Sequence, residues 1–281
     1  MDLPRTLPDQ PRGATFPAPA RLVPFFFGPP ERRLFGLLHP PRGTPRGRGV
    51  LLCGPFGHEA LRFHRALGQL GQHLAGAGLA VLRFDPFGTG DSAGGDEDLR
   101  LDGWQDDIAR ALDELRARDA TLRDVDVVGL RLGAALALRA AARHGGVRRL
   151  VLWDPVPDGR THLAELEALH RTMLRVAHVR PTPAEARGEP RQLLGFTLAP
   201  ELVEQLAAFD LADVDRRPAE RVLLLDSHPD AQPGRLRARL APLVPLDEQS
   251  RPARELWRWQ QDASRQLVPL NLLQDIVTWL G

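Results

Sequence analysis

The sequence contains no lysine, so arginine supplies all 37 of its Lys+Arg cations. We interpret this absence as a coding bias towards GC-rich codons, without a functional meaning. An excess of charge of one sign is missing too, because 36 acidic residues bring the net charge to +1. A nearly balanced charge gives no electrostatic reason to expect nucleic acid or an anionic membrane as the main partner.

Cysteine is nearly absent, and the single Cys53 excludes an internal disulfide. Cys53 ends an apolar run, so we interpret it as a small buried hydrophobic residue and not as a nucleophile assisted by His58. The spacings of a zinc site are missing. His162, His170 and His178 recur every eight residues, but no carboxylate cluster accompanies them. The sequence therefore predicts no metal and no other cofactor, and it is compatible with a reducing compartment.

Long apolar runs are also missing, because no stretch approaches the roughly 18 apolar residues that a membrane helix needs. Residues 1–20 are rich in proline, show no hydrophobic period and lack an apolar run of signal-peptide length. This composition predicts a disordered tail. We therefore expect a cytoplasmic protein that does not insert into a membrane.

What the sequence does contain is an alternation of short apolar runs and helical patterns, which predicts an α/β domain over residues 21–281. We expect a mostly parallel sheet of about eight strands flanked by helices. The alternation breaks at Pro155, and residues 156–215 are mostly helical, which predicts a cap inserted at the ligand-binding edge of the sheet. The clearest predicted strands are Gly49–Cys53, Leu79–Phe84, Val125–Val128, Leu150–Trp153 and Arg221–Leu225, and the clearest predicted helices are Leu61–Ala75, Asp102–Arg118, Leu132–Arg143 and Leu270–Leu280.

One predicted strand leads into Gly129-Leu130-Arg131-Leu132-Gly133 and then into a helix of small residues. This layout resembles the nucleophile elbow of α/β-hydrolases, in which Gly-x-Ser-x-Gly makes a sharp strand-to-helix turn. The alternative is an ordinary strand–turn–helix of a Rossmann-like sheet. In the resemblance, Arg131 occupies the place of the nucleophile, and a guanidinium is permanently charged and does not act as one.

Other segments extend the resemblance in the right order. Leu51–His58 resembles the loop that supplies oxyanion-hole amides, and Asp85–Ser92 resembles the family's Asp-x-x-Gly-x-Gly-x-Ser loop. Within the superfamily, the chain is most similar to the exosortase A system-associated hydrolase 2 group, on the serine-aminopeptidase-like branch, and that group too tends to carry arginine at the elbow. The segments behind this likeness are Gly54–Glu59, Gly129–Ala134, Leu152–Val156 and Gly195–Pro200.

A complete serine-type triad is not recognisable. Gly90–Gly94 matches Gly-x-Ser-x-Gly, but it neither follows its strand directly nor opens an apolar helix, so we interpret Ser92 as a loop residue with local hydrogen bonds. Asp226 and Asp230 lie where the family has its acid, yet the last histidine, His228, comes too early to be the base. Ser92 and Asp226 are therefore weak candidates, and no catalytic residue is expected.

Arg131 has two possible roles. It can form a structural ion pair, with Glu59 as the first choice of partner because Glu59 lies in the loop that faces the elbow, directly after Gly54–His58; Asp85, Asp91 and Asp154 are the others. Alternatively, it can bind a carboxylate or phosphate at the helix N-terminus. The residues expected around the pocket are Gly54, Pro55, His58, Glu59, Asp85, Arg131, Leu132 and Asp154.

Two functions follow from these patterns. The first is a non-catalytic or atypical homologue that binds a small anionic ligand or a protein partner under the cap. The second is an active hydrolase, such as an esterase, thioesterase or peptidase-like enzyme, with catalytic residues outside the usual triad. The fold alone favours the second, whereas the missing serine and the missing late histidine favour the first.

Overall fold

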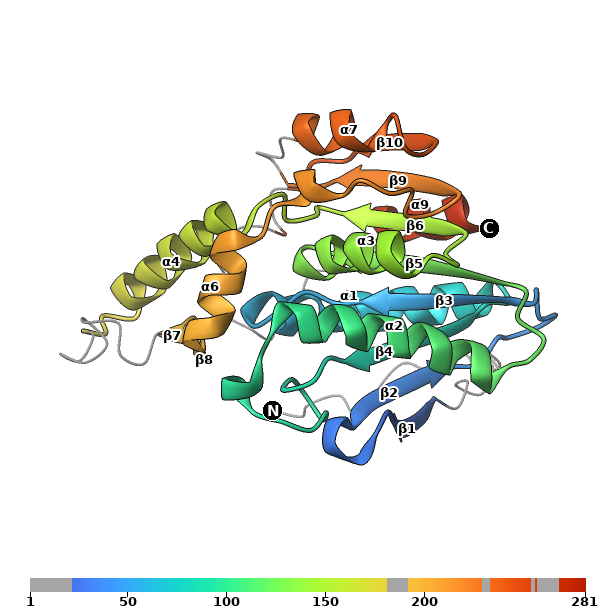
Figure 1. Ribbon diagram of the computed structural model, residues 1–281, viewed down its shortest axis with the longest axis horizontal. Helices are drawn as coiled ribbons and strands as arrows, with labels where there is room; N and C mark the ends of the chain where they lie inside the picture. Colours follow the sequence, from blue (N-terminus) through green and yellow to red (C-terminus); the bar gives the residue numbers. More distant parts are fainter. Residues whose placement is uncertain (1–21, 181–191, 229–232, 254–255, 257–267) are drawn as a thin grey trace, which may run out of the picture.

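The structure is a computed structural model that describes residues 22–180, 192–228, 233–253, 256 and 268–281 (Figure 1). The predicted tail over residues 1–20 and the candidate Asp230 lie outside these described residues.

An eight-stranded sheet forms the centre of the molecule, with the strand order β1-β2-β4-β3-β5-β6-β9-β10. β2 pairs antiparallel with β1 and β4, whereas β4, β3, β5, β6, β9 and β10 run parallel to one another. This arrangement confirms the mostly parallel sheet that the sequence predicts. The strands are β1 (Val23–Phe27), β2 (Leu34–His39), β3 (Arg48–Cys53), β4 (Ala80–Asp85), β5 (Asp124–Leu130), β6 (Arg149–Trp153), β9 (Arg221–Asp226) and β10 (Leu246–Ser250).

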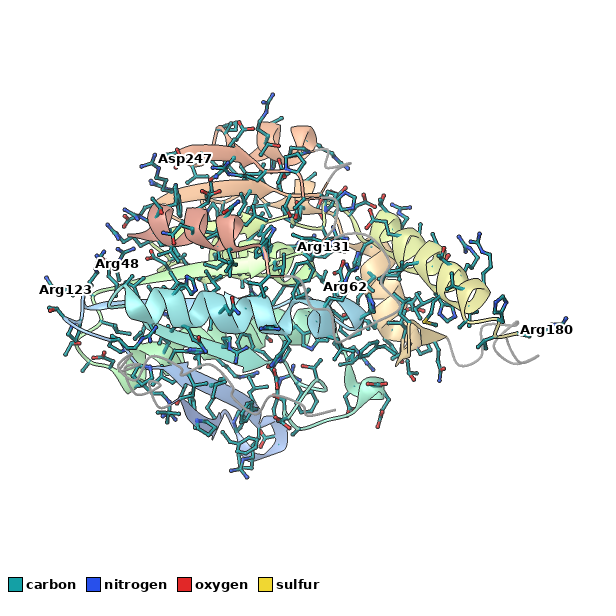
Figure 2. The ribbon with its side chains drawn as sticks, turned by 180° about the vertical axis from the view of Figure 1, so that it is seen from behind. Arg48, Arg62, Arg123, Arg131, Arg180 and Asp247 are labelled. Carbon is teal, nitrogen blue, oxygen red and sulfur yellow. The ribbon has the colours of Figure 1, made fainter. Side chains whose placement is uncertain are left out.

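Helices cover both faces of this sheet (Figures 1 and 2). α2 (Leu101–Arg118) and α3 (Leu132–His144) pack together on one face, and α1 (His58–Gly76) and α9 (Leu270–Leu280) pack on the other. Because neighbouring side chains of a strand point to opposite faces, each central strand contributes to two cores. In β3, Leu51 and Cys53 belong to the core under α2 and α3, while Val50 and Leu52 belong to the core under α1.

Between β6 and β9 the chain leaves the sheet at the carboxyl ends of the parallel strands, over the residues 156–215 for which the sequence suggested a cap (Figure 1). We call this segment the cap. Its longest element, α4, begins after Asp158, whose side chain accepts a hydrogen bond from the backbone N–H of Thr161. The described elements of the cap are α4 (Gly159–Val176), β7 (Gln192–Leu193), β8 (Phe196–Thr197), α6 (Pro200–Ala208) and η3 (Leu211–Asp213).

Two differences from the sequence-based expectation affect the site or the sheet edge. Helix α1 begins at His58, ahead of the predicted start at Leu61, so Glu59 lies in its first turn and not in the preceding loop. Strand β10 was not predicted, because Asp247-Glu248-Gln249-Ser250 has no apolar run. β10 is an edge strand with one neighbour, so its side chains need no apolar pattern. The remaining short elements are η1 (Pro30–Arg32), η2 (Asp96–Asp98) and α7 (Gly234–Leu240).

Candidate functional site

A sharp turn joins β5 to α3, and Arg131 stands at its tip with φ 55° and ψ −123°. Such a conformation is costly for a residue other than glycine, on the order of 1–3 kcal/mol, and persists only where the surroundings enforce it. Both flanking glycines are required by close packing. A Cβ on Gly129 would lie 2.3 Å from the Cα of Ala134, and a Cβ on Gly133 would lie 2.1 Å from the carbonyl oxygen of Gly54. The turn therefore has the crowded geometry of an elbow.

The guanidinium of Arg131 is buried between the elbow and the cap (Figure 2). Its Nε donates to Glu59 Oε1 at 2.8 Å, and its Nη2 donates to Glu165 Oε2 at 2.8 Å. The Nδ1 atom of His162, a buried residue of α4, lies 3.4 Å from the same Nη2. The predicted contact with Glu59 is present, and the partners from α4 are additional. Arg131 thus connects the elbow, the first turn of α1 and the cap.

Opposite charges dominate the electrostatics of this cluster. Burial by itself lowers the pKa of Arg131, but the carboxylates of Glu59 and Glu165 outweigh burial and raise it above its usual value. Burial raises the pKa of Glu165, whereas the His162 imidazole 3.9 Å away and the ion pair with Arg131 outweigh this and lower it to about 2. With two carboxylates facing one guanidinium, the positive charge of Arg131 is already neutralised within the chain.

Asp154 follows β6 and lies beside the elbow with φ 44°. Its buried carboxylate accepts hydrogen bonds from the backbone N–H groups of Ser227 at 2.7 Å and His228 at 3.0 Å, and from the Ser227 hydroxyl. Burial and the nearby Asp154 raise the pKa of Asp226 to about 6. Asp154 is therefore used to fix the loop after β9, and Arg131 pairs with Glu59 and Glu165 instead.

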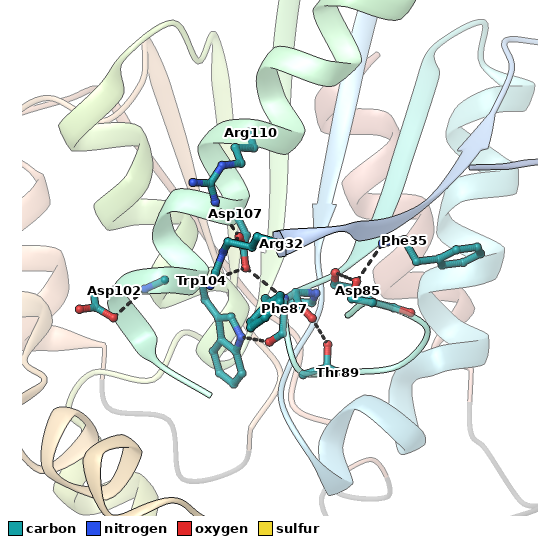
Figure 3. Close-up of polar contacts among 12 residues, drawn as sticks. Arg32, Phe35, Asp85, Phe87, Thr89, Asp102, Trp104, Asp107 and Arg110 are labelled. Atoms are coloured by element: carbon teal, nitrogen blue, oxygen red, sulfur yellow. Dashed lines mark hydrogen bonds and ion pairs between the residues drawn. The ribbon is translucent and has the colours of Figure 1, made fainter. Parts of the chain in front are cut away.

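Ser92 lies in the loop after β4, where its hydroxyl is bonded on two sides. The hydroxyl donates to the carbonyl oxygen of Asp85 at 2.5 Å and accepts from the backbone N–H of Phe35 at 2.8 Å, and Figure 3 labels these two partners. The loop leads into the short 3-10 helix η2, and α2 begins only after it. The same loop is attached to α2, because the indole N–H of Trp104 donates to the carbonyl oxygen of Phe87 at 2.9 Å. These contacts give Ser92 the local structural bonds that the sequence indicated.

A cavity of about 560 Å³ opens beside the elbow, between the loop after β3, the loop after β4 and the start of α3. Four of the expected pocket residues line it: Gly54, Pro55, Asp85 and Leu132. The other four do not: His58, Glu59, Arg131 and Asp154. The guanidinium of Arg131 is instead held by the carboxylates of Glu59 and Glu165. Most of the wall is apolar: Phe35, Leu37, Leu52, Phe56, Leu67, Phe84, Trp104, Ile108, Leu136 and Phe196.

Sequence reasoning missed His162 and Glu165 as partners of Arg131. Their three-residue spacing on a helix after a capping aspartate was visible, because residues at i and i+3 share a helix face. What the sequence did not show is that this face meets the elbow. His170 is bound differently, since its Nδ1 accepts from the backbone N–H of Leu194 at 3.1 Å.

The described residues contain no group of three or more histidine, cysteine, aspartate or glutamate side chains arranged to hold a metal ion. Across the same residues, no helix combines the length and the apolar character needed to cross a membrane.

The parallel sheet, the strand–turn–helix elbow and the inserted cap define an α/β-hydrolase fold. The chain belongs to the serine aminopeptidase S33 family, which matches residues 49–208, more than half of the sequence. No curated protein matches the chain.

Solved structures agree on the fold. Est1E from Butyrivibrio proteoclasticus with bound ferulic acid is 18% identical, with a TM-score of 0.62 over 91% of this chain and 97% of that one. Proline iminopeptidase from Mycobacterium smegmatis is 12% identical, with a TM-score of 0.61 over 92% and 97%. XC6422 from Xanthomonas campestris, an α/β serine hydrolase without a lid, is 19% identical, with a TM-score of 0.57 over 94% and 93%. At these identities the likeness concerns the fold alone.

Proposed function

We propose that this chain is a non-hydrolytic member of its family that binds a small, largely apolar molecule in the cavity beside the elbow. The observation that carries this proposal is Arg131 at the elbow tip, buried and paired with Glu59 and Glu165. A nucleophile cannot act from that position, and the ion pairs connect the cap to the place where substrate would be attacked.

Among the described residues, neither Ser92 nor Cys53 is suited to replace the nucleophile. The Ser92 hydroxyl is held by Phe35 and Asp85. Burial raises the pKa of the Cys53 thiol far above its usual value, so the reactive thiolate does not form. Pro55, in the loop that supplies oxyanion-hole amides in the family, has no backbone N–H to donate. No histidine follows His228 to serve as a late base.

The cavity supports a binding role. Its volume of about 560 Å³ lies within the roughly 300–1,000 Å³ that is typical of small-molecule sites. Its walls are mostly apolar, and apolar walls with a few polar groups are the usual composition of such sites. Because Arg131 is neutralised by its own partners and does not line the cavity, we propose an apolar ligand in place of the anionic one that the sequence suggested.

We also propose that the chain is cytoplasmic. We propose further that it belongs to the exosortase-associated group, because several of its segments resemble that group.

Two assays test the proposal. Turnover of 4-nitrophenyl butyrate and labelling by a fluorophosphonate probe should both be absent, and Arg131→Ser should restore neither, because no base is in place. Labelling of Ser92 or any other serine would contradict the non-hydrolytic assignment.

For binding, the neutral probe 2-(2-naphthyl)ethanol should raise the melting temperature of the wild-type protein by mass action. Ala60→Trp, which fills the cavity from the first turn of α1, should abolish this rise. Ala117→Trp, an exposed position near the end of α2, is the matched control and should keep it. A rise that survives Ala60→Trp would place the probe elsewhere and overturn the binding role.

A further inference from the structure

We infer that the natural occupant of the cavity is an amphipathic amine, with an apolar or aromatic body and a protonated amino group directed towards Asp85. This inference rests on the proposed binding function and specifies the chemical class of its ligand.

The first observation is the charge of the cavity wall. Three aspartates line it, Asp85, Asp91 and Asp96, whereas Arg83 is the one guanidinium among the described lining residues. Arg83 also uses its Nε to donate to His39 Nε2 at 3.2 Å, so part of its hydrogen-bonding capacity is taken. The cavity therefore has a negative surplus, which favours a cation and disfavours a carboxylate or phosphate.

The second observation concerns the position of Asp85. It is the last residue of β4, and its Oδ2 accepts from the backbone N–H of Asp91 at 3.0 Å, which holds the carboxylate in place at the cavity wall. Burial, opposed in part by Arg83 and His64, raises the pKa of this carboxyl. A partly buried carboxylate that has lost water gains most from a cationic hydrogen-bond donor.

The third observation is an aromatic wall in the same cavity. The Phe56 ring lies 5.1 Å from the Trp104 ring and 6.1 Å from the Phe196 ring, centroid to centroid, and all three residues line the cavity. Such rings offer faces to an apolar or aromatic body, and their π faces also attract a nearby cation. Phe196 comes from the cap and Trp104 from α2, so the apolar body would contact both the cap and the core domain.

The experiment compares three probes that share a naphthyl body: 2-(2-naphthyl)ethylamine, 2-(2-naphthyl)ethanol and 3-(2-naphthyl)propionate. Calorimetric titration near pH 7 should give the amine a dissociation constant about tenfold below that of the alcohol, which corresponds to one charge-assisted hydrogen bond. The propionate should bind most weakly.

Two kinds of variant separate the contribution of the amino group to binding affinity from the contribution of the apolar body of the ligand. Asp85→Asn should bring the amine to the affinity of the alcohol and leave the alcohol unchanged. Phe56→Ala should weaken the amine and the alcohol alike. Asp113→Asn, on the exposed face of α2, is the charge control and should change neither. If Asp85→Asn fails to fold, Asp91→Asn at the exposed rim provides the same comparison with a smaller loss.

The outcomes distinguish this inference from the proposed function. If the alcohol binds as tightly as the amine, or the propionate binds more tightly, the amine class is wrong while binding in the cavity stands. If none of the three probes binds the wild-type protein, the proposed binding function fails together with the inference. An amine preference that persists in both Asp85→Asn and Asp91→Asn also overturns the assignment of the amino group to this wall.

Discussion

Two segments of this chain carry glycines four residues apart around a central polar residue, Gly129–Gly133 with Arg131 and Gly90–Gly94 with Ser92. In sequence alone, the second segment matches the serine-hydrolase motif Gly-x-Ser-x-Gly and the first does not. In the structure, the first is the elbow between β5 and α3, with its central residue at φ 55°. The second is a loop that follows β4 and leads into a 3-10 helix.

The side-chain hydrogen bonds of the two central residues differ as much as their backbone conformations. Ser92 bridges the backbones of Phe35 and Asp85, two residues of neighbouring strands. Arg131 joins side chains from α1 and α4 at the sheet edge where ligands bind in this fold. The geometry of strand, turn and helix therefore identifies the functional position, and the residue at that position then decides the chemistry.

The largest effect is expected at the elbow. Arg131→Met leaves Glu59 buried without its cation, and breaking a buried pair on one side typically costs about 3–5 kcal/mol of unfolding free energy. The double variant Arg131→Met with Glu59→Gln should recover part of this loss, since no uncompensated charge remains. Urea denaturation of the single and double variants gives the comparison.

Arg171→Met is the control for removing an arginine, because the Arg171 side chain is exposed and its ion pair with Glu167 is long, at 4.0 Å. It should change stability by less than about 0.5 kcal/mol. If the Arg131→Met protein were as stable as this control, Arg131 would have no structural role at the elbow.

A smaller effect is expected at the serine of the second segment. Ser92→Ala leaves the backbone N–H of Phe35 without its acceptor, which should cost about 1–3 kcal/mol of unfolding free energy. Thr172→Ala, which removes an exposed hydroxyl bond on α4, should cost less. If Ser92→Ala left the melting temperature unchanged, the hydroxyl bonds of Ser92 would not stabilise this loop.

The smallest effect is expected at Glu165, whose side chain is 47% exposed. Glu165→Gln should cost less than about 1 kcal/mol near pH 7, because exposed ion pairs are weak. The folded protein lowers the pKa of Glu165 from 4.5 to about 2, so its contribution is present above pH 4.5 and is lost as the pH falls towards 2. The stability difference between wild type and Glu165→Gln should therefore shrink over that range, and a constant difference would contradict the pairing.

The sequence predicted most of the fold and only part of the site. The central strands are continuous apolar runs bounded by turns, a pattern that survives without tertiary information, whereas β10 is polar because it lies at an edge. The Arg131–Glu59 contact was predictable from the order of segments in the fold. The contacts of His162 and Glu165 were not, since they depend on how α4 returns to the elbow, and the same holds for the cavity, whose lining does not include Arg131.

The contact between Gly133 and Gly54 limits how this protein can move. Because a Cβ on Gly133 would lie 2.1 Å from the Gly54 carbonyl oxygen, the start of α3 and the loop after β3 are packed backbone against backbone. These two segments line part of the cavity wall, and they cannot separate without losing this backbone packing. Adjustment of the cavity wall to a bound molecule is therefore expected on the opposite sides, at the β7–β8 hairpin that carries Phe196 or at the loop after β4.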